Sequence, residues 1–304
     1  MRPKLIAGLD IGTTNTCAVI GETVGDPRRP GLTILGVGQT RTEGLRGDMV
    51  TNIEEITESV RASMKEAELM AGVSVDRVYA GIGGDYVRAW NSMGVVAISE
   101  DEVSRDDMER VHIVARAVAL PADREMVHAI PQEYRVDDQQ GIKDPLGMAG
   151  VRLEAEVFLV TCQIAGSTNI RKAVNQAGYC VQEMVLEPLA GGRAVLTEDE
   201  KEGGVVMVEI GASTTDVVAY YEGKVQHVSI LPFGGKTLTA DLVRGLSVPY
   251  AEAKKAKEQY GIAFAQMVDP RETVEMPGPS PGQMRAIARE LIAHIIEQRL
   301  DEMF

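Results

Sequence analysis

The sequence predicts an α/β fold built from two related halves, with an insertion in the first half. Three observations predict it. Apolar strand-like segments alternate with segments whose apolar residues recur at helical spacing. An apolar strand, a small polar turn and a second strand open the chain and recur from Val205 onward. The region between Asp85 and Gln163 differs in character from both flanking regions, and the chain, at 304 residues, is long enough for several domains.

The composition is that of a folded globular protein, with 44% hydrophobic and 25% charged residues. The net charge of -14, from 31 basic and 45 acidic side chains, repels nucleic acids and anionic membrane surfaces. No apolar run approaches the roughly 20 residues that cross a bilayer, and the chain does not open with a signal peptide. We therefore expect a cytoplasmic protein that does not bind nucleic acid.

The first elements predicted in order are strands at residues 5–10, 16–21, 32–37 and 75–82. A helix is predicted from Thr51 to Gly72, because apolar residues repeat there at helical spacing. Thr51 and Glu54 can form a capping box at its start, and Gly72 can end its last turn. This mixture of elements indicates an α/β layer domain.

The later elements follow the same rules. A helix is predicted after Ser104, and the charged turn at residues 197–204 is the predicted domain boundary. Other helices are predicted at residues 167–178, 189–196, 237–245 and 282–304, with a strand at 181–186. In the last helix, Ile295, Ile296 and Leu300 are expected to pack inward.

The two small polar turns carry the main functional prediction. The first contains Asp10, Gly12, Thr13, Thr14 and Asn15, and the second contains Glu209, Gly211, Ala212, Ser213 and Thr214. Glycine lets the backbone approach a ligand closely, and consecutive amides with hydroxyl groups suit phosphate oxygens. The acids suit Mg²⁺, through water. One such turn alone is explained equally well as a β-hairpin turn, but two copies favour a cleft that grips a polyphosphate from both sides.

These paired turns resemble the phosphate-1 and phosphate-2 loops of the actin, Hsp70 and sugar-kinase superfamily. A more specific similarity lies in the insertion, where residues 130–134, 140–145 and 150–152 resemble the inserted subdomain of the FtsA family of bacterial cell division proteins. Similar segments at residues 66–70, 99–103 and 195–200 extend this resemblance over nearly the whole chain.

The resemblance implies an actin-like, ribonuclease H-like fold of duplicated domains. Subdomain IA is expected at residues 1–84 plus 164–196, with the inserted subdomain 1C at 85–163 between its two parts. Subdomains IIA at 197–240 and IIB at 241–304 are expected to be incomplete.

The resemblance also implies ATP and Mg²⁺ as ligands, filament formation through subdomain 1C, and a link between the tubulin-like protein FtsZ and the membrane during septum formation. Other division proteins are expected partners, and the expected location is the inner face of the cell membrane at the division site. ATPase activity is expected to be weak or absent, because Glu209 stands where the superfamily usually has Asp and Ala212–Ser213 replace a Gly-rich pair.

Two features of the resembling family do not occur in this sequence. No Gly-Gly pair for adenosine follows Gly235, and the C-terminal amphipathic helix that would bind the membrane is missing. We therefore expect either a fragment or a natural short form.

Other site residues each have a plain structural alternative. Glu187 resembles an acid that positions a hydrolytic water, but an acid beside Pro188 also suits a first helical turn. Glu252 and Lys255 resemble a pair that flanks adenosine, but they also fit an exposed ion pair three residues apart.

Gly234, Gly235 and Lys236 can bring backbone donors to the phosphates at a helix start, or form an ordinary turn. The four histidines lack a paired acid or nucleophile in sequence, so structural roles are predicted for them.

Two rival functions stay open at this point. Residues 8–14 match the opening of sugar kinases, which would make the protein a carbohydrate kinase, and another actin-like scaffold ATPase would share the nucleotide cleft. The insertion argues against both.

Overall fold

The computed structural model describes residues 4–26, 29–47, 49–278 and 282–304. The chain forms two compact units, one of Met1–Glu209 with Asp216–Ile230 and one of Ile210–Thr215 with Leu231–Phe304. This division does not test the four predicted subdomains, whose bounds stay predictions.

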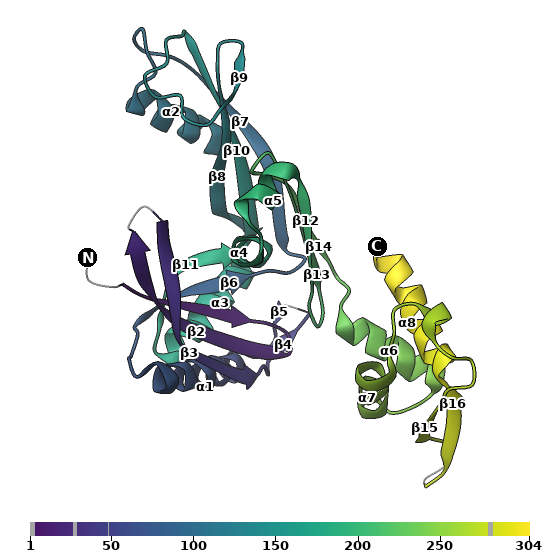
Figure 1. Ribbon diagram of the computed structural model, residues 1–304. Coiled ribbons are helices and arrows are strands. Elements are labelled where there is room, and N and C mark those ends of the chain that lie inside the picture. The colour runs from purple at the N-terminus through teal and green to yellow at the C-terminus, as the bar shows by residue number, and fades with distance from the viewer. Residues whose placement is uncertain (1–3, 27–28, 48, 279–281) are drawn as a thin grey trace. The chain divides into compact units, whose positions relative to one another are not determined.

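The first unit begins with a five-stranded mixed sheet in the order β11-β6-β1-β2-β3 (Figure 1). Strand β1 pairs antiparallel with β2 and parallel with β6, and β3 forms one edge. The strands are β1 (Leu5–Ile11), β2 (Asn15–Asp26), β3 (Arg29–Arg41), β6 (Arg77–Ile82) and β11 (Cys180–Leu186), with a short ribbon of β4 (Leu45–Arg46) and β5 (Met49–Val50) nearby in the chain. The four predicted strands of this region are confirmed, although β2 and β3 are longer than expected.

The N-cap of helix α1 (Ile53–Ala71) lies one residue later than predicted. Asn52 is its N-cap, and the Asn52 side chain accepts the amides of Glu54 and Glu55 at 3.0 and 3.3 Å. The predicted capping box with Thr51 is therefore wrong, because the Thr51 hydroxyl donates instead to the Gly44 carbonyl. The predicted stop at Gly72 is confirmed, since this glycine has a left-handed backbone with φ of 68°.

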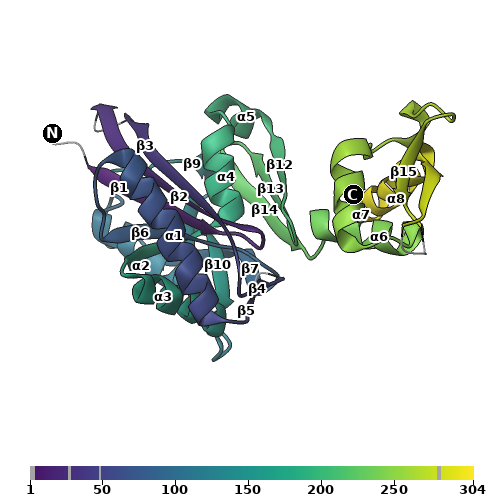
Figure 2. The same cartoon turned by 90° about the horizontal axis from the view of Figure 1, so that it is seen from below.

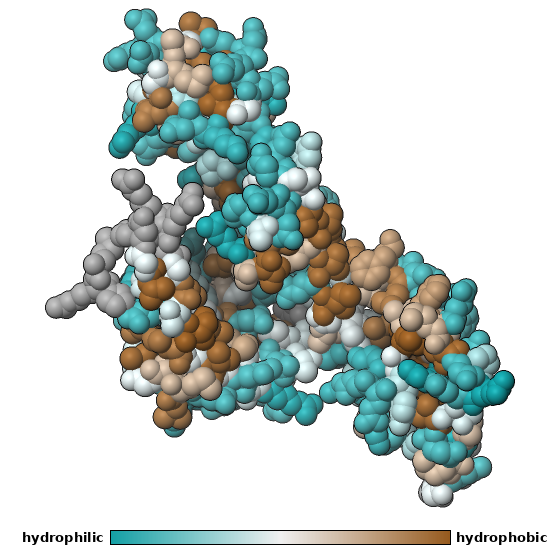
Figure 3. Space-filling view, in the orientation of Figure 1, coloured by the Kyte–Doolittle hydropathy of each residue, from teal (hydrophilic) through white to brown (hydrophobic). Residues whose placement is uncertain are grey.

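Helix α1 lies along β2 and β3, beside α3 (Ile164–Ala177) (Figure 2). Its approach to β3 is so close that a Cβ atom on Gly36 or Gly38 would collide with helix backbone. Glycine is therefore required at both positions for this packing. The outer surface of this region carries exposed apolar side chains, among them Leu32 and Ile34, which are 52% and 51% exposed (Figure 3).

The insertion forms its own four-stranded sheet in the order β7-β10-β8-β9. Its elements are β7 (Val87–Ala97), α2 (Arg105–Arg116), β8 (Arg124–Val136), β9 (Gln139–Ile142) and β10 (Arg152–Gln163). Helix α2 packs on β7 and β10, and a separate core forms around fully buried residues such as Val111, Leu153 and Leu159. The predicted inserted unit is thus a layer of helix on sheet.

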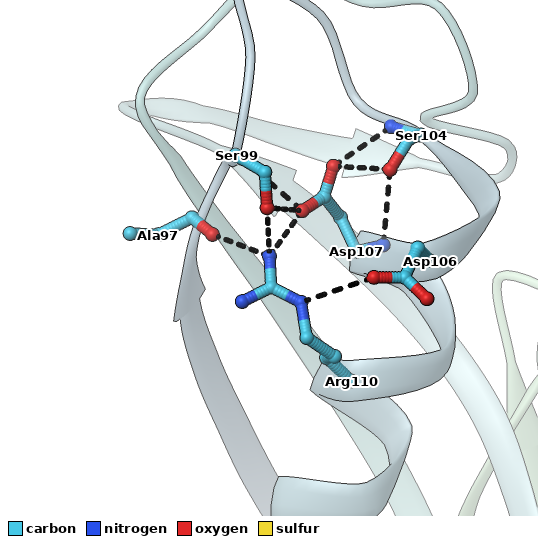
Figure 4. A network of polar contacts seen from close by, with 6 residues as sticks. All are labelled: Ala97, Ser99, Ser104, Asp106, Asp107 and Arg110. Atoms are coloured by element: carbon cyan, nitrogen blue, oxygen red, sulfur yellow. Dashed lines mark hydrogen bonds and ion pairs between the residues drawn. The ribbon is translucent and has the colours of Figure 1, made fainter.

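The start of α2 is held by the fully buried carboxylate of Asp107 (Figure 4). This carboxylate accepts the amide and hydroxyl of Ser104 at 2.9 and 2.6 Å and the hydroxyl of Ser99 at 2.9 Å, and it pairs with Arg110. The hydrogen bonds from Ser104, with those from Arg110 and Ser99, hold the Asp107 pKa far below its ordinary value. Arg110 also donates to the Ala97 carbonyl at 2.9 Å, so the network ties α2 to the end of β7.

The first unit continues with α4 (Glu187–Val195), the short helix α5 (Glu198–Gly203) and a three-stranded sheet in the order β12-β13-β14. These strands are β12 (Val205–Ile210), β13 (Thr215–Tyr221) and β14 (Lys224–Leu231). Val218, Tyr220 and Val225 join the same core as the first sheet, and Gly192 of α4 leaves room for the Tyr220 ring.

The second unit packs helices against a two-stranded ribbon. Its elements are α6 (Gly235–Leu246), α7 (Tyr250–Tyr260), a 3-10 turn (Ala265–Met267), β15 (Thr273–Pro277), β16 (Met284–Ala288) and α8 (Arg289–Met303). Leu242 and Ile292 are fully buried in its core, and Asp241 of α6 accepts from Arg299 of α8 at 2.6 Å.

The helix predicted at residues 282–304 is wrong in its first part. Residues Met284–Ala288 pair with β15 as a strand, and the helix begins only at Arg289. Cross-strand pairing with residues seven to fifteen positions away overrides the local spacing here. The inward packing expected of Ile295, Ile296 and Leu300 is confirmed.

Candidate functional site

The first polar turn joins β1 to β2 and is closed by one backbone hydrogen bond. The Gly12 amide donates to the Asn15 carbonyl at 3.1 Å. The Thr42 amide donates to the Thr14 carbonyl at 2.9 Å, and the buried hydroxyls of Thr16 and Thr42 lie 2.8 Å apart. The end of β3 therefore fixes this turn in place.

The second polar turn, between β12 and β13, has the same closing bond. The Gly211 amide donates to the Thr214 carbonyl at 2.9 Å. A Cβ atom on either turn glycine would lie 3.1 Å from the carbonyl that closes its turn, so the two backbones match closely. Asp10 and Glu209, each two residues before its glycine, have exposed side chains.

The start of α6 supports the second turn. The Gly235 amide donates to the Gly211 carbonyl at 2.9 Å, and the Lys236 amide donates to the Ala212 carbonyl at 2.8 Å. A Cβ atom on Gly234 would lie only 2.7 Å from the backbone of Ala212. We expected this segment to offer amides to phosphate, but the structure uses two of those amides to hold the turn.

Lysine 257 of α7 was missed by the sequence analysis. Its Nζ donates to the Gly235 carbonyl at 2.7 Å, beside the second turn, and burial lowers the Lys257 pKa. Glu252 is half-buried and Lys255 is exposed on the same helix. Lys255 cannot share the face of Lys257, because residues two apart point to different sides of a helix.

The spacing of residues along α7 could have indicated the position of Lys257. Ala253 is fully buried and Ala256 is 2% exposed, and together they mark the inward face of α7. Lys257 follows Ala253 by four residues and so lies beside that face.

Glu187 is the first residue of α4, directly after β11, as expected. Its carboxylate lies over Gly81 and Gly83 at the end of β6, where a Cβ atom on either glycine would collide with it. The sequence analysis did not single out these two glycines, although Gly-Ile-Gly at a strand end is a signal for close approach. The same helix passes Glu209, because a Cβ atom on Gly191 would lie 3.1 Å from a Glu209 carboxylate oxygen. The N-terminus of α4 therefore carries Glu187, and its middle lies beside Glu209.

The chemistry available is that of anion and cation binding by backbone and carboxylates. Among the described residues, no group of three His, Cys, Asp or Glu side chains is placed to hold a metal ion.

Two family models match separate parts of the chain. One, described as an SHS2 domain inserted in FTSA, matches residues 84–161, and one described as cell division protein FtsA matches residues 206–297. The first range lies close to the predicted insertion at residues 85–163.

Curated relatives match over nearly the full chain. The cell division protein FtsA of Pseudomonas aeruginosa is 40% identical over 301 residues, which are 99% of this chain and 72% of the relative. The FtsA of Escherichia coli K12 is 36% identical over 300 residues, 99% of this chain and 71% of the relative.

Among solved structures, a type IV pilus biogenesis complex of PilM and PilN superposes with a TM-score of 0.62 at 19% identity. The match covers 84% of this chain and 69% of that one. At this identity the match concerns the fold alone, and it agrees with the predicted actin-like α/β class with an inserted domain. In the described ranges, no helix has the length and apolar character needed to cross a membrane.

Proposed function

Because the chain belongs to the FtsA family of bacterial cell division proteins, we propose that it binds Mg-ATP, polymerises and links FtsZ to the cytoplasmic membrane at the division site. The observation that carries the nucleotide part is the matched pair of turns, each closed by the same glycine amide bond and each preceded by an exposed acid. Two such turns are what a cleft needs to hold a polyphosphate from both sides.

The proposed contacts follow from the geometry of each turn. Backbone amides and hydroxyls of residues 12–15 and 211–214 would bind phosphate oxygens, while Asp10 and Glu209 would bind Mg²⁺ through water. Gly234 and Gly235 would act by holding the second turn rather than by touching phosphate. Lys257 would add positive charge beside that turn, and Glu252 and Lys255 stay proposed as residues near the adenosine.

Glu187 is proposed to position a water for hydrolysis. Its carboxylate lies over Gly81 and Gly83, and Glu187 is half-buried at the start of α4. We expect slow or absent hydrolysis, because Ala212 and Ser213 add Cβ atoms where relatives of the superfamily carry glycine.

Titration of a fluorescent ATP analogue into the 304-residue chain, with and without Mg²⁺, tests the nucleotide proposal. Saturable binding that weakens without Mg²⁺ is the expected result. Absence of saturable binding in both conditions would contradict the proposal.

Residues 8–14 match the opening of sugar kinases, but this turn also resembles the phosphate loops of the wider superfamily, and the insertion matches the FtsA family. A coupled assay with a panel of sugars should therefore show no phosphorylation. Phosphorylation of any sugar would reopen that alternative.

Filament formation is proposed to use the inserted subdomain. Ile113 and Val151 are apolar residues of this subdomain that are 58% and 76% exposed, so Glu at both positions leaves its core intact. Assembly in solution, measured by electron microscopy, should be lost in this variant. Leu69→Glu on α1, where Leu69 is 76% exposed, is the control that should still assemble.

The link to FtsZ is tested by cosedimentation with FtsZ polymers. The chain should pellet with polymerised FtsZ and stay in the supernatant without it. Equal pelleting in both samples would contradict a specific link.

We expect that this chain by itself does not bind anionic lipid. Its net charge is -14, and the apolar side chains of α8 such as Ile296, 5% exposed, already pack inward. Little protein should pellet with anionic liposomes at moderate salt. Strong pelleting would show that the chain carries a lipid-binding surface of its own.

A further inference from the structure

We propose that His128 of the inserted subdomain is a positioning residue that fixes the peptide before Glu187 and so couples the inserted subdomain to the nucleotide site. The coupling to nucleotide rests on the function proposed above, whereas the positioning of the peptide stands on geometry alone. The sequence analysis predicted only an unspecified structural role for this histidine.

The geometry is a single hydrogen bond between segments far apart in the sequence. The amide of Leu186 donates to Nε2 of His128 at 3.0 Å, across 58 residues of chain. Leu186 is fully buried, and Glu187 follows it directly. Burial lowers the His128 pKa, so the imidazole is neutral near pH 7 and its Nε2 can accept.

This hydrogen bond forms at the N-terminus of α4, where no N-cap side chain makes a hydrogen bond. Leu186 is the N-cap of α4, and its side chain makes no capping hydrogen bond. Pro188 at the second helical position has no amide to contribute. An imidazole from β8 therefore accepts the amide of the N-cap residue, which the side chain of the third helical residue accepts in a capping box.

The position of that peptide influences where the Glu187 carboxylate lies. The Leu186 amide belongs to the peptide between Val185 and Leu186, so a shift of this peptide would also shift the backbone of Glu187, which follows Leu186 directly. Gly81 and Gly83 leave room for the carboxylate in its present position, and an error of about 1 Å at a reacting group is costly.

Strand β8 is also fixed further along its length. Gln132 accepts the Val225 amide at 2.7 Å, and the carboxylate of Glu133 pairs with Lys224. The strand thus connects the start of α4 with β14. A displacement of the inserted subdomain would reach Leu186 through His128, and by reciprocity nucleotide binding would bias the inserted subdomain.

The test compares His128→Gln with His128→Asn in the 304-residue chain. The Gln side chain can place its carbonyl oxygen near the position of Nε2 and accept the Leu186 amide, whereas Asn is equally polar but too short. Hydrogen exchange of the peptide that contains Leu186 should be about tenfold faster in His128→Asn and near the parent rate in His128→Gln. Equal exchange in all three proteins would overturn the positioning role.

Mg-ATP affinity is the second readout, with His112→Asn as the matched control. His112 lies in the same subdomain but bonds to the Tyr134 hydroxyl at 2.7 Å. We expect an affinity loss of about three- to tenfold for His128→Asn, because α4 also passes Glu209, which is proposed to bind Mg²⁺ through water. We expect rescue in His128→Gln and no loss for His112→Asn. Faster exchange at Leu186 with unchanged affinity would overturn the coupling. If the parent binds no nucleotide, the proposed function fails, and the exchange data alone decide whether His128 holds this peptide.

Discussion

The two polar turns share one backbone geometry, but different contacts hold each turn in place. Each is closed by a glycine amide that donates to the carbonyl three residues later, at 3.1 Å in the Gly12 turn and 2.9 Å in the Gly211 turn. The Gly12 turn is held from β3 by a pair of buried threonine hydroxyls. The Gly211 turn is held by two amides at the start of α6.

The difference shows that the turn geometry and its support are separable. The first turn depends on side-chain hydroxyls within one sheet, so it is sensitive to polar substitutions there. The second depends on close backbone approach, so it is sensitive to added volume at Gly234. The residue after the turn glycine also differs, because Thr13 carries a hydroxyl and Ala212 carries none.

The largest expected effect is the loss of Asp10. We expect Asp10→Ala to weaken Mg-ATP binding by about ten- to hundredfold, because a charge-assisted contact to the bound cation or its waters contributes about 1.5 to 3 kcal/mol. Glu209→Ala should cost less, because Asp10 lies at the turn that matches the phosphate loops of the superfamily more closely. Titration with fluorescent ATP measures both, and Asp10→Ala binding as tightly as the parent would refute the cation geometry.

The next largest expected effect is on stability, and it tests whether the start of α6 holds the Gly211 turn. Gly234→Ala is expected to destabilise the chain by about 1 to 3 kcal/mol, because its Cβ atom would press on the backbone of Ala212. Gly235→Ala is the matched control, since its Cβ atom would lie 3.2 Å from Nζ at the end of the long Lys257 side chain and 3.7 Å from the Gly211 carbonyl oxygen, without a backbone clash. Urea unfolding measures both variants. Equal stabilities would mean that α6 does not brace the turn.

The first support is tested by Thr42→Val. This change removes one of two buried hydroxyls that lie 2.8 Å apart, and it should cost about 1 kcal/mol of unfolding free energy by leaving Thr16 without that partner. Adding Thr16→Val should recover part of the loss, because both polar groups are then gone. A double variant whose cost is the plain sum of the single costs would argue against a coupled pair.

The smallest expected effect is that of Glu209→Asp, which makes the second acid match the first. Shortening the side chain by one methylene should keep Mg-ATP affinity or raise it by a few fold, equivalent to less than about 1 kcal/mol. Complete loss of binding would show that Glu209 reaches its ligand only at its present length.

The elements whose signals are local were predictable from the sequence. Ser104 and the apolar residues after it predicted α2, and Gly72 predicted the end of α1. The β16 strand was not predictable in this way. Met284, Ile287 and Leu291 happen to fit helical spacing, while the partner strand β15 that decides the conformation lies across a loop.

The residues of the candidate site also divide into those that a local sequence pattern predicts and those that it does not. Both turns could be found because glycine, acid and hydroxyl residues repeat in one short pattern. Lys257 bonds with Gly235 across 22 residues, and His128 bonds with Leu186 across 58. No short pattern encodes such contacts, since they arise only when the helices and sheets have packed.

The connection between the inserted sheet and the rest of the first unit affects how readily a protease can cut the chain there. Arg124 donates to the carbonyls of Tyr86 and Thr161 at 3.1 and 2.9 Å. These hydrogen bonds hold together the segment that leads into the inserted subdomain and the segment that leads out of it. Both β7 and β8 pair with β10 in this region. Proteolytic enzymes need unpaired, exposed chain, and these connections offer paired strands instead. Limited digestion should therefore spare the junction and leave the inserted subdomain attached to the body.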